Sequence, residues 1–69
     1  MPLSSIGAGE RRRVKAVTGN DAVRKHLETL GFTEGAEVTI INEMNGNLII
    51  GVMDSRVALD RSLANRILV

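Results

Sequence analysis

Two glycines set close together divide this chain into a helical part and an alternating part. The apolar residues are spaced as in a helix up to Leu30, and that spacing stops at Gly31. Gly35 follows as a second turn residue, and beyond it the apolar residues alternate. Glycine suits the left-handed backbone that commonly ends a helix, and alternation is typical of a half-buried strand. The stretch therefore predicts a helix over residues 22–30, a tight corner and a strand.

The predicted helix has a capping signal and one apolar stripe. Asn20 or Asp21 can accept a hydrogen bond from the first free N–H groups of the helix. The stripe that should face the core contains Val23, His26, Leu27 and Leu30.

A first strand is expected within residues 10–17, because apolar and basic side chains alternate there. Its inner face would carry Val14 and Ala16. Its outer face would carry the basic residues Arg11, Arg13 and Lys15.

The strands after the corner predict a hairpin that turns near Gly46, and two loop lengths compete. A two-residue loop over 45–46 would pair apolar residues with small or polar ones, Ile40 with Gly51 and Asn42 with Ile49. A three-residue loop over 44–46 pairs apolar residues on both faces, Val38 with Val52, Ile40 with Ile50 and Ile41 with Ile49. We therefore predict the three-residue loop, with Gly46 in the left-handed position.

The last third of the chain predicts three more short elements. Residues 54–55 should turn the chain, and a strand over 56–59 should follow with Val57 and Leu59 inward. Asp60 can cap a short helical turn, and residues 67–69 read as a closing strand.

These elements predict a small, mainly β fold. A bent sheet that closes on itself hides its edges, which indicates an SH3-like β-barrel with one inserted α-helix and a short C-terminal helical turn. The chain is expected to be a single domain over residues 1–69. Residues 1–9 are small and polar with two glycines, and they are expected to form a loosely held arm.

Composition excludes several classes of protein. The chain has no cysteine, so disulfides and thiolate metal sites are ruled out. Phe32 is the only aromatic residue, which argues against modules that stack nucleic-acid bases or bind proline-rich peptides. No apolar run approaches the roughly 20 residues that span a bilayer, so no membrane insertion is expected. There is no Ser–His–acid set and no glycine-rich phosphate loop after a strand, and we predict no enzymatic activity.

The order and spacing of the glycines and aliphatic residues resemble the ferrous iron transport protein A (FeoA) family over nearly the whole chain. The features that carry the resemblance are the opening residues 3–9, Val14 and Val17 followed by Gly19, the helix end over 27–32, Gly35, Val38 with Ile40, Ile50 with Val52, residues 57–59, Leu63 with Ala64, and Ile67 with Val69. One departure is Glu34, where the family often has proline.

The resemblance implies a small cytoplasmic accessory protein that has no cofactor of its own and is linked to Fe(II) only through its pathway. Its implied partner is the membrane ferrous iron transporter that carries a cytosolic G-protein domain.

Two polar features offer alternative functions. His26 is the only histidine, and with Glu28, Glu34 or Glu37 it could form a carboxylate-rich metal site, although softer ligands are missing. Residues 11–15 form a basic run that could bind nucleic acid, or could simply protect a sheet edge. We favour the structural interpretation of each feature: His26 as a helix residue half covered by the core, and the basic run as a solvated strand face or the protection of a sheet edge. We expect no specific nucleic-acid binding, because the net charge is only +1.

An outward-facing apolar strip is the main candidate for a partner or self-association surface. If the neighbouring residues face the core, this strip contains Ile41, Ile49 and Met53, with Met44 at the loop tip. The helix or the N-terminal arm could instead cover it. Arg11 and Arg13 are the next interface candidates.

Overall fold

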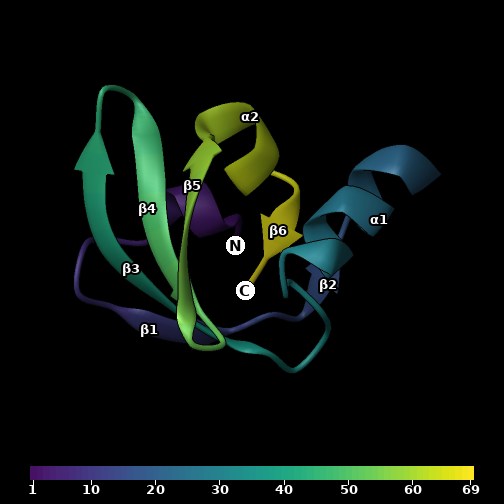
Figure 1. The fold of residues 1–69 in the computed structure, drawn as a ribbon, viewed down its shortest axis with the longest axis horizontal. Helices are drawn as coiled ribbons and strands as arrows, with labels where there is room; N and C mark the ends of the chain where they lie inside the picture. Colours follow the sequence, from purple (N-terminus) through teal and green to yellow (C-terminus); the bar gives the residue numbers. More distant parts are fainter.

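Two small antiparallel sheets enclose one hydrophobic core in the computed structural model, which describes residues 1–69 (Figure 1). The elements are η1 Leu3–Ser5, β1 Arg11–Arg13, β2 Ala16–Val17, α1 Asp21–Thr29, β3 Glu37–Met44, β4 Asn47–Val52, β5 Ser55–Asp60, α2 Arg61–Ala64 and β6 Ile67–Leu68. One sheet has the strand order β1-β3-β4-β5, and the other pairs β2 with β6. The predicted mainly β architecture, with one inserted helix and a C-terminal helical turn, is confirmed.

The expected first strand is divided between the two sheets. After β1, the N–H of Val14 donates to the carbonyl of Ala36 at 2.9 Å, and the N–H of Lys15 donates to that of Leu68 at 2.7 Å. This change of partner interrupts the alternation. Val14 is buried as predicted, but Ala16 is exposed, so its predicted place on the inner face was wrong.

Helix α1 begins one residue earlier in the chain than predicted, and Asn20 caps it. The side-chain oxygen of Asn20 accepts the N–H of Val23 at 2.9 Å. Leu27 is fully buried and Leu30 is half-buried, whereas His26 is exposed. Including His26 in the buried stripe was therefore wrong, because the core-facing positions are confined to a narrower i, i+4, i+7 row.

The corner after α1 is built from two glycines with left-handed backbone. The N–H of Phe32 donates to the carbonyl of Leu27 at 3.0 Å, and that of Gly31 donates to Glu28 at 2.9 Å. This pair of bonds is the Schellman pattern that ends a helix at a glycine. Gly31 has φ 107° and Gly35 has φ 84°, conformations that favour glycine.

The β3–β4 hairpin turns through two residues, so the predicted three-residue loop was wrong. Asn45 and Gly46 have φ 52° and 80°, as a type I′ turn requires at both central residues. Near the corner the strands pair Val38 with Val52 and Ile40 with Ile50, and near the loop they pair Asn42 with Ile49, Glu43 with Leu48 and Met44 with Asn47. Ile41 is the additional residue of a β-bulge. Each of the two registers considered from the sequence thus holds on one side of the bulge.

The second hairpin turns at residues 53–54, one residue before the predicted turn, because β5 already begins at Ser55. Val57 is half-buried and Leu59 is buried, as predicted. The side chain of Asp60 accepts the N–H of Leu63 at 2.8 Å, which confirms the predicted cap of α2.

The first residues belong to the core, and the prediction of a loosely held arm over 1–9 was wrong. Leu3 is fully buried and Ile6 is only 6% exposed. The terminal ammonium of Met1 donates to the carbonyl of Val69 at 3.0 Å, and the N–H of Val69 donates back to Met1 at 2.7 Å. The two chain ends therefore lie side by side (Figure 1).

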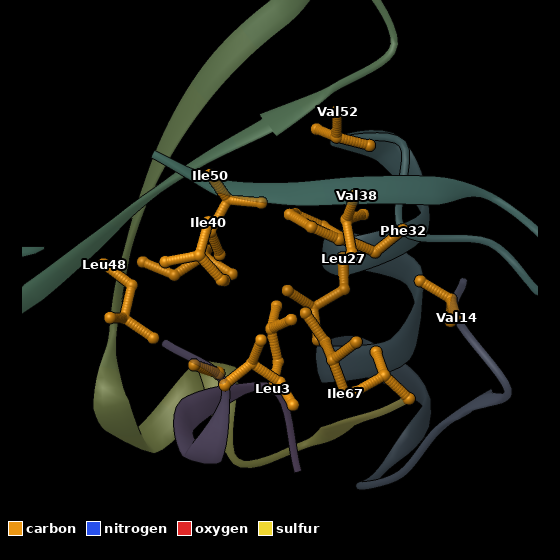
Figure 2. Close-up of a cluster of buried hydrophobic side chains, with 14 residues drawn as sticks. Leu3, Val14, Leu27, Phe32, Val38, Ile40, Leu48, Ile50, Val52 and Ile67 are labelled. Carbon is orange, nitrogen blue, oxygen red and sulfur yellow. The ribbon is translucent and has the colours of Figure 1, made fainter. Parts of the chain in front are cut away.

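The core fills the space between the curled sheet, α1 and the two ends of the chain (Figure 2). It contains Leu3, Ile6, Val14, Leu27, Phe32, Val38, Ile40, Leu48, Ile50, Val52, Leu59, Ala64, Ile67 and Val69. Burying a large aliphatic side chain stabilises a fold by about 1.5–3 kcal/mol. No polar or charged residue is buried. Any functional site must therefore lie on the surface.

Candidate interaction surface

The outer face of the β3–β4 hairpin carries three apolar side chains, Ile41, Met44 and Ile49, which we call the hairpin strip. Ile40 and Ile50, their neighbours along the strands, are buried in the core. Ile41 and Ile49 are half-buried, and Met44 at the loop is 56% exposed. The strip thus offers apolar surface beside the sheet, part of which neighbouring side chains already cover.

The bulge separates the two isoleucines that were expected to face each other. Ile49 lies opposite Asn42. Ile41 instead lies over Gly51, where an added Cβ would be 3.3 Å from Cδ1 of Ile41. The predicted Ile41–Ile49 pair was therefore wrong, because the additional residue in β3 shifts the register between them.

Met53 was expected farther along the same face, and this placement was wrong. It lies in the β4–β5 turn with φ 56° and is 81% exposed. Its side chain covers Gly31, where an added Cβ would come within 2.9 Å of the Met53 sulfur. Met53 thus belongs to the helix-to-strand corner, and the strand alternation that suggested its position ends at Val52.

The basic strand β1 flanks the hairpin strip at one edge of the sheet. It pairs only with β3, Arg11 opposite Thr39 and Arg13 opposite Glu37, so both arginines share the outer face. Nε of Arg11 and Nη2 of Arg13 lie 3.9 and 4.0 Å from the Glu37 carboxylate. The glutamate offsets part of the positive charge, and the two arginines form a basic rim beside the apolar side chains of the hairpin strip.

Glu10 neutralises the remaining arginine of this strand. Its carboxylate accepts the N–H of Gly7 at 2.8 Å and a guanidinium N–H of Arg12 at 2.7 Å. These hydrogen bonds, the one from Gly7 first, and the charge of Arg12 hold the pKa of Glu10 below its ordinary value. The basic run is therefore an edge strand whose charges are largely paired within the chain.

His26 does not form a metal-binding cluster with the acidic residues considered as its partners. It is exposed on α1, and no group of three or more His, Cys, Asp or Glu side chains lies close enough to hold a metal ion.

None of the helices has the length and apolar character that crossing a bilayer requires.

A groove of about 440 Å³ lies beside α1 and was not predicted from the sequence. Its helical wall carries Asp21, Arg24, Lys25 and Glu28, and Arg24 pairs with Asp21 at 2.6 Å. The signal was the i, i+3, i+4, i+7 spacing of these charges on the face opposite the apolar stripe. Glu34 also lines the groove, so three acidic and two basic side chains face it, and these mixed charges give no strong preference for an anion or a cation.

Residues 1–69 match the FeoA domain. A Methanocaldococcus jannaschii protein with the provisional name Fe(2+) transport protein A is 31% identical over 99% of this chain and 83% of its own length. The crystal structure of an iron uptake regulatory protein (FeoA) is 35% identical, with 96% of this chain and 88% of that chain aligned at a TM-score of 0.88.

A third relative bears on the fold directly. Stenotrophomonas maltophilia FeoA, solved in complex with zinc and described as an SH3 domain protein, is 31% identical and aligns with a TM-score of 0.87. The alignment covers 99% of this chain and 87% of that one. The SH3-like architecture predicted from the sequence is therefore confirmed.

Proposed function

The chain belongs to the FeoA domain family, and from this premise we propose that it is an accessory protein of ferrous iron transport that acts by binding a membrane transporter. The partner would be the transporter's cytosolic G-protein domain, which would place this chain in the cytoplasm. The full-length match to the family carries the proposal. The S. maltophilia relative has itself been put forward as a ferrous iron transport activating factor.

The distribution of polar groups supports a binding role over a chemical one. The interior contains only apolar side chains, and no cluster of ligands for a resident metal is present. Fe(II) enters this proposal as the cargo of the partner, and we propose neither catalysis nor a cofactor for this chain.

The hairpin strip is the surface that we propose for the transporter contact. Ile41 and Ile49 retain exposed apolar surface, and Arg11 and Arg13 border them on the same face. An interface with an apolar centre and a charged rim is the usual arrangement in protein complexes. Burying the remaining apolar surface would supply affinity, and the arginines would steer the approach of an acidic partner.

A pull-down with the transporter's cytosolic domain tests the proposal. The Ile41→Thr/Ile49→Thr double variant keeps strand propensity and removes apolar surface from the strip, so it should fold and lose binding. Val17→Thr/Leu68→Thr is the matched control, because both residues are half-buried strand residues of the other sheet. Equal binding by the two folded double variants would place the contact elsewhere, with Arg11 and Arg13 to be tested next.

A further inference from the structure

The two edge strands of the four-stranded sheet differ in how well each could pair with the same strand of a second copy of the chain. β1 is one edge and β5 is the other. Antiparallel pairing of β1 with itself would set arginine against arginine, and like charges directly opposite each other destabilise a strand pair. β5 has the sequence Ser-Arg-Val-Ala-Leu-Asp over residues 55–60, with one charge of each sign near its ends.

The backbone of β5 has free hydrogen-bonding groups along its outer edge. Opposing residues of an antiparallel pair alternate between hydrogen-bonded and non-bonded positions, and the two-residue turn makes Ser55 opposite Val52 a bonded pair. Val57 is then also bonded to β4, and Arg56 and Ala58 direct their N–H and C=O groups away from it. No backbone hydrogen bond outside the strand ladder involves residues 55–59. An unpaired edge of this kind is a template for another strand.

The two charges of β5 also have no ionic partner within the chain. Arg56 is exposed and takes part in no ion pair. Asp60 is exposed too, and one of its carboxylate oxygens accepts the N–H of Leu63 in the cap of α2. In contrast, all three arginines of β1 are paired with Glu10 or Glu37.

We propose that this protein forms a two-fold dimer by antiparallel pairing of β5 with β5 of a second copy, centred on Ala58. In this register Arg56 lies opposite Asp60 of the second copy, and Val57 lies opposite its Leu59. At the two-fold axis, the outward N–H and C=O groups of Ala58 form hydrogen bonds with those of Ala58 in the second copy. This one register pairs the free backbone groups of the two strands, sets opposite charges against each other and sets apolar side chains against apolar side chains.

The small side chain at the axis allows this approach. Ala58 is exposed on the outer face, next to Ile49 across the β4–β5 ladder. The dimer would carry one continuous sheet, and the two Ile49 side chains would stand roughly 14 Å apart, three strand spacings. The inference does not depend on the proposed transporter partner.

Sedimentation of the purified chain tests the proposal. The wild type should show a monomer–dimer equilibrium, and Ala58→Pro should abolish it by removing a donor at the axis and blocking the edge. Arg56→Glu, which sets Glu against Asp60, should weaken association by about tenfold or more and recover in part at high salt. The matched control is Arg66→Glu, which makes the same charge change at another exposed arginine without an ion pair.

The outcomes separate cleanly. Association lost in Arg56→Glu and kept in Arg66→Glu, with concentration-dependent protection of the Arg56 and Ala58 amides from hydrogen exchange, supports the dimer. A wild type that remains monomeric up to about 1 mM overturns it, since a pair weaker than that has little free energy of association. Equal association by wild type and Arg56→Glu also overturns it. If Ala58→Pro fails to fold, the two charge variants still decide the question.

Discussion

The thioether sulfur of Met53 lies directly over the backbone of Gly31, so that a Cβ added to Gly31 would come within 2.9 Å of it. The β4–β5 turn is thereby packed against the corner where α1 ends. Gly31 is thus required first by its φ of 107°. An added Cβ would also lie 3.2 Å from Cγ2 of Val52, which is buried in the core and cannot move aside as the exposed Met53 side chain can.

Gly31→Ala should reduce the free energy of unfolding more than Gly35→Ala does. Both glycines have positive φ, which costs an L-residue roughly 1–2 kcal/mol, but an added Cβ at Gly35 meets nothing within 4 Å. Denaturant melts measure the difference, which we attribute to the buried Val52 side chain beside Gly31. Equal midpoints for the two glycine variants would contradict the contact.

The carboxylate of Glu10 should titrate below an ordinary glutamate. The N–H of Gly7 and the guanidinium of Arg12 favour its charged form, so its pKa is lower in the folded than in the unfolded chain. Its contribution to stability is then complete above the unfolded-state pKa and is lost as the pH falls through the folded-state pKa. NMR titration of the carboxyl carbon should show this midpoint, and Arg12→Gln should raise it. A midpoint that Arg12→Gln leaves unchanged would refute the assignment.

Anaerobic calorimetry with Fe(II) should give no tight, stoichiometric binding event. His26 is exposed and no cluster of metal ligands gathers around it or elsewhere. His26→Ala should therefore behave like the wild type. A tight isotherm that disappears in His26→Ala would instead favour the carboxylate-based metal-binding alternative.

Nucleic-acid binding should be weak and should disappear between about 50 mM and about 200 mM salt. The reason is that Glu10 and Glu37 pair with the arginines of β1, which leaves few cations for phosphate groups. Fluorescence anisotropy with RNA and DNA oligonucleotides measures this. Sequence-selective binding that persists at physiological salt would favour the small-barrel nucleic-acid alternative.

The features predicted well from the sequence are those that depend on neighbouring residues. The cap of α1 at Asn20 or Asp21, which the structure assigns to Asn20, the end of α1 at Gly31 and the cap at Asp60 each require only a short stretch of chain. The inner register of Ile40 with Ile50 followed from apolar alternation.

The features that the sequence could not predict depend on distant partners. The division of the first strand depends on Leu68, which takes the hydrogen bond of Lys15. The bulge at Ile41 reconciles a turn preferred by Asn45-Gly46 with a register set by the core, and neither requirement alone reveals it. The hairpin strip was recognised by alternation, but Met53 was misplaced because the strand ends before it.

The most direct test of the proposed function is an NMR titration of the isotope-labelled chain with the cytosolic G-protein domain of the ferrous iron transporter. The account predicts saturable shift changes centred on the amides of Ile41, Asn42 and Ile49, with smaller changes at Arg11 and Arg13. The Ile41→Thr/Ile49→Thr variant should lose them. An absence of shift changes, or changes confined to α1 and its groove, would contradict the account.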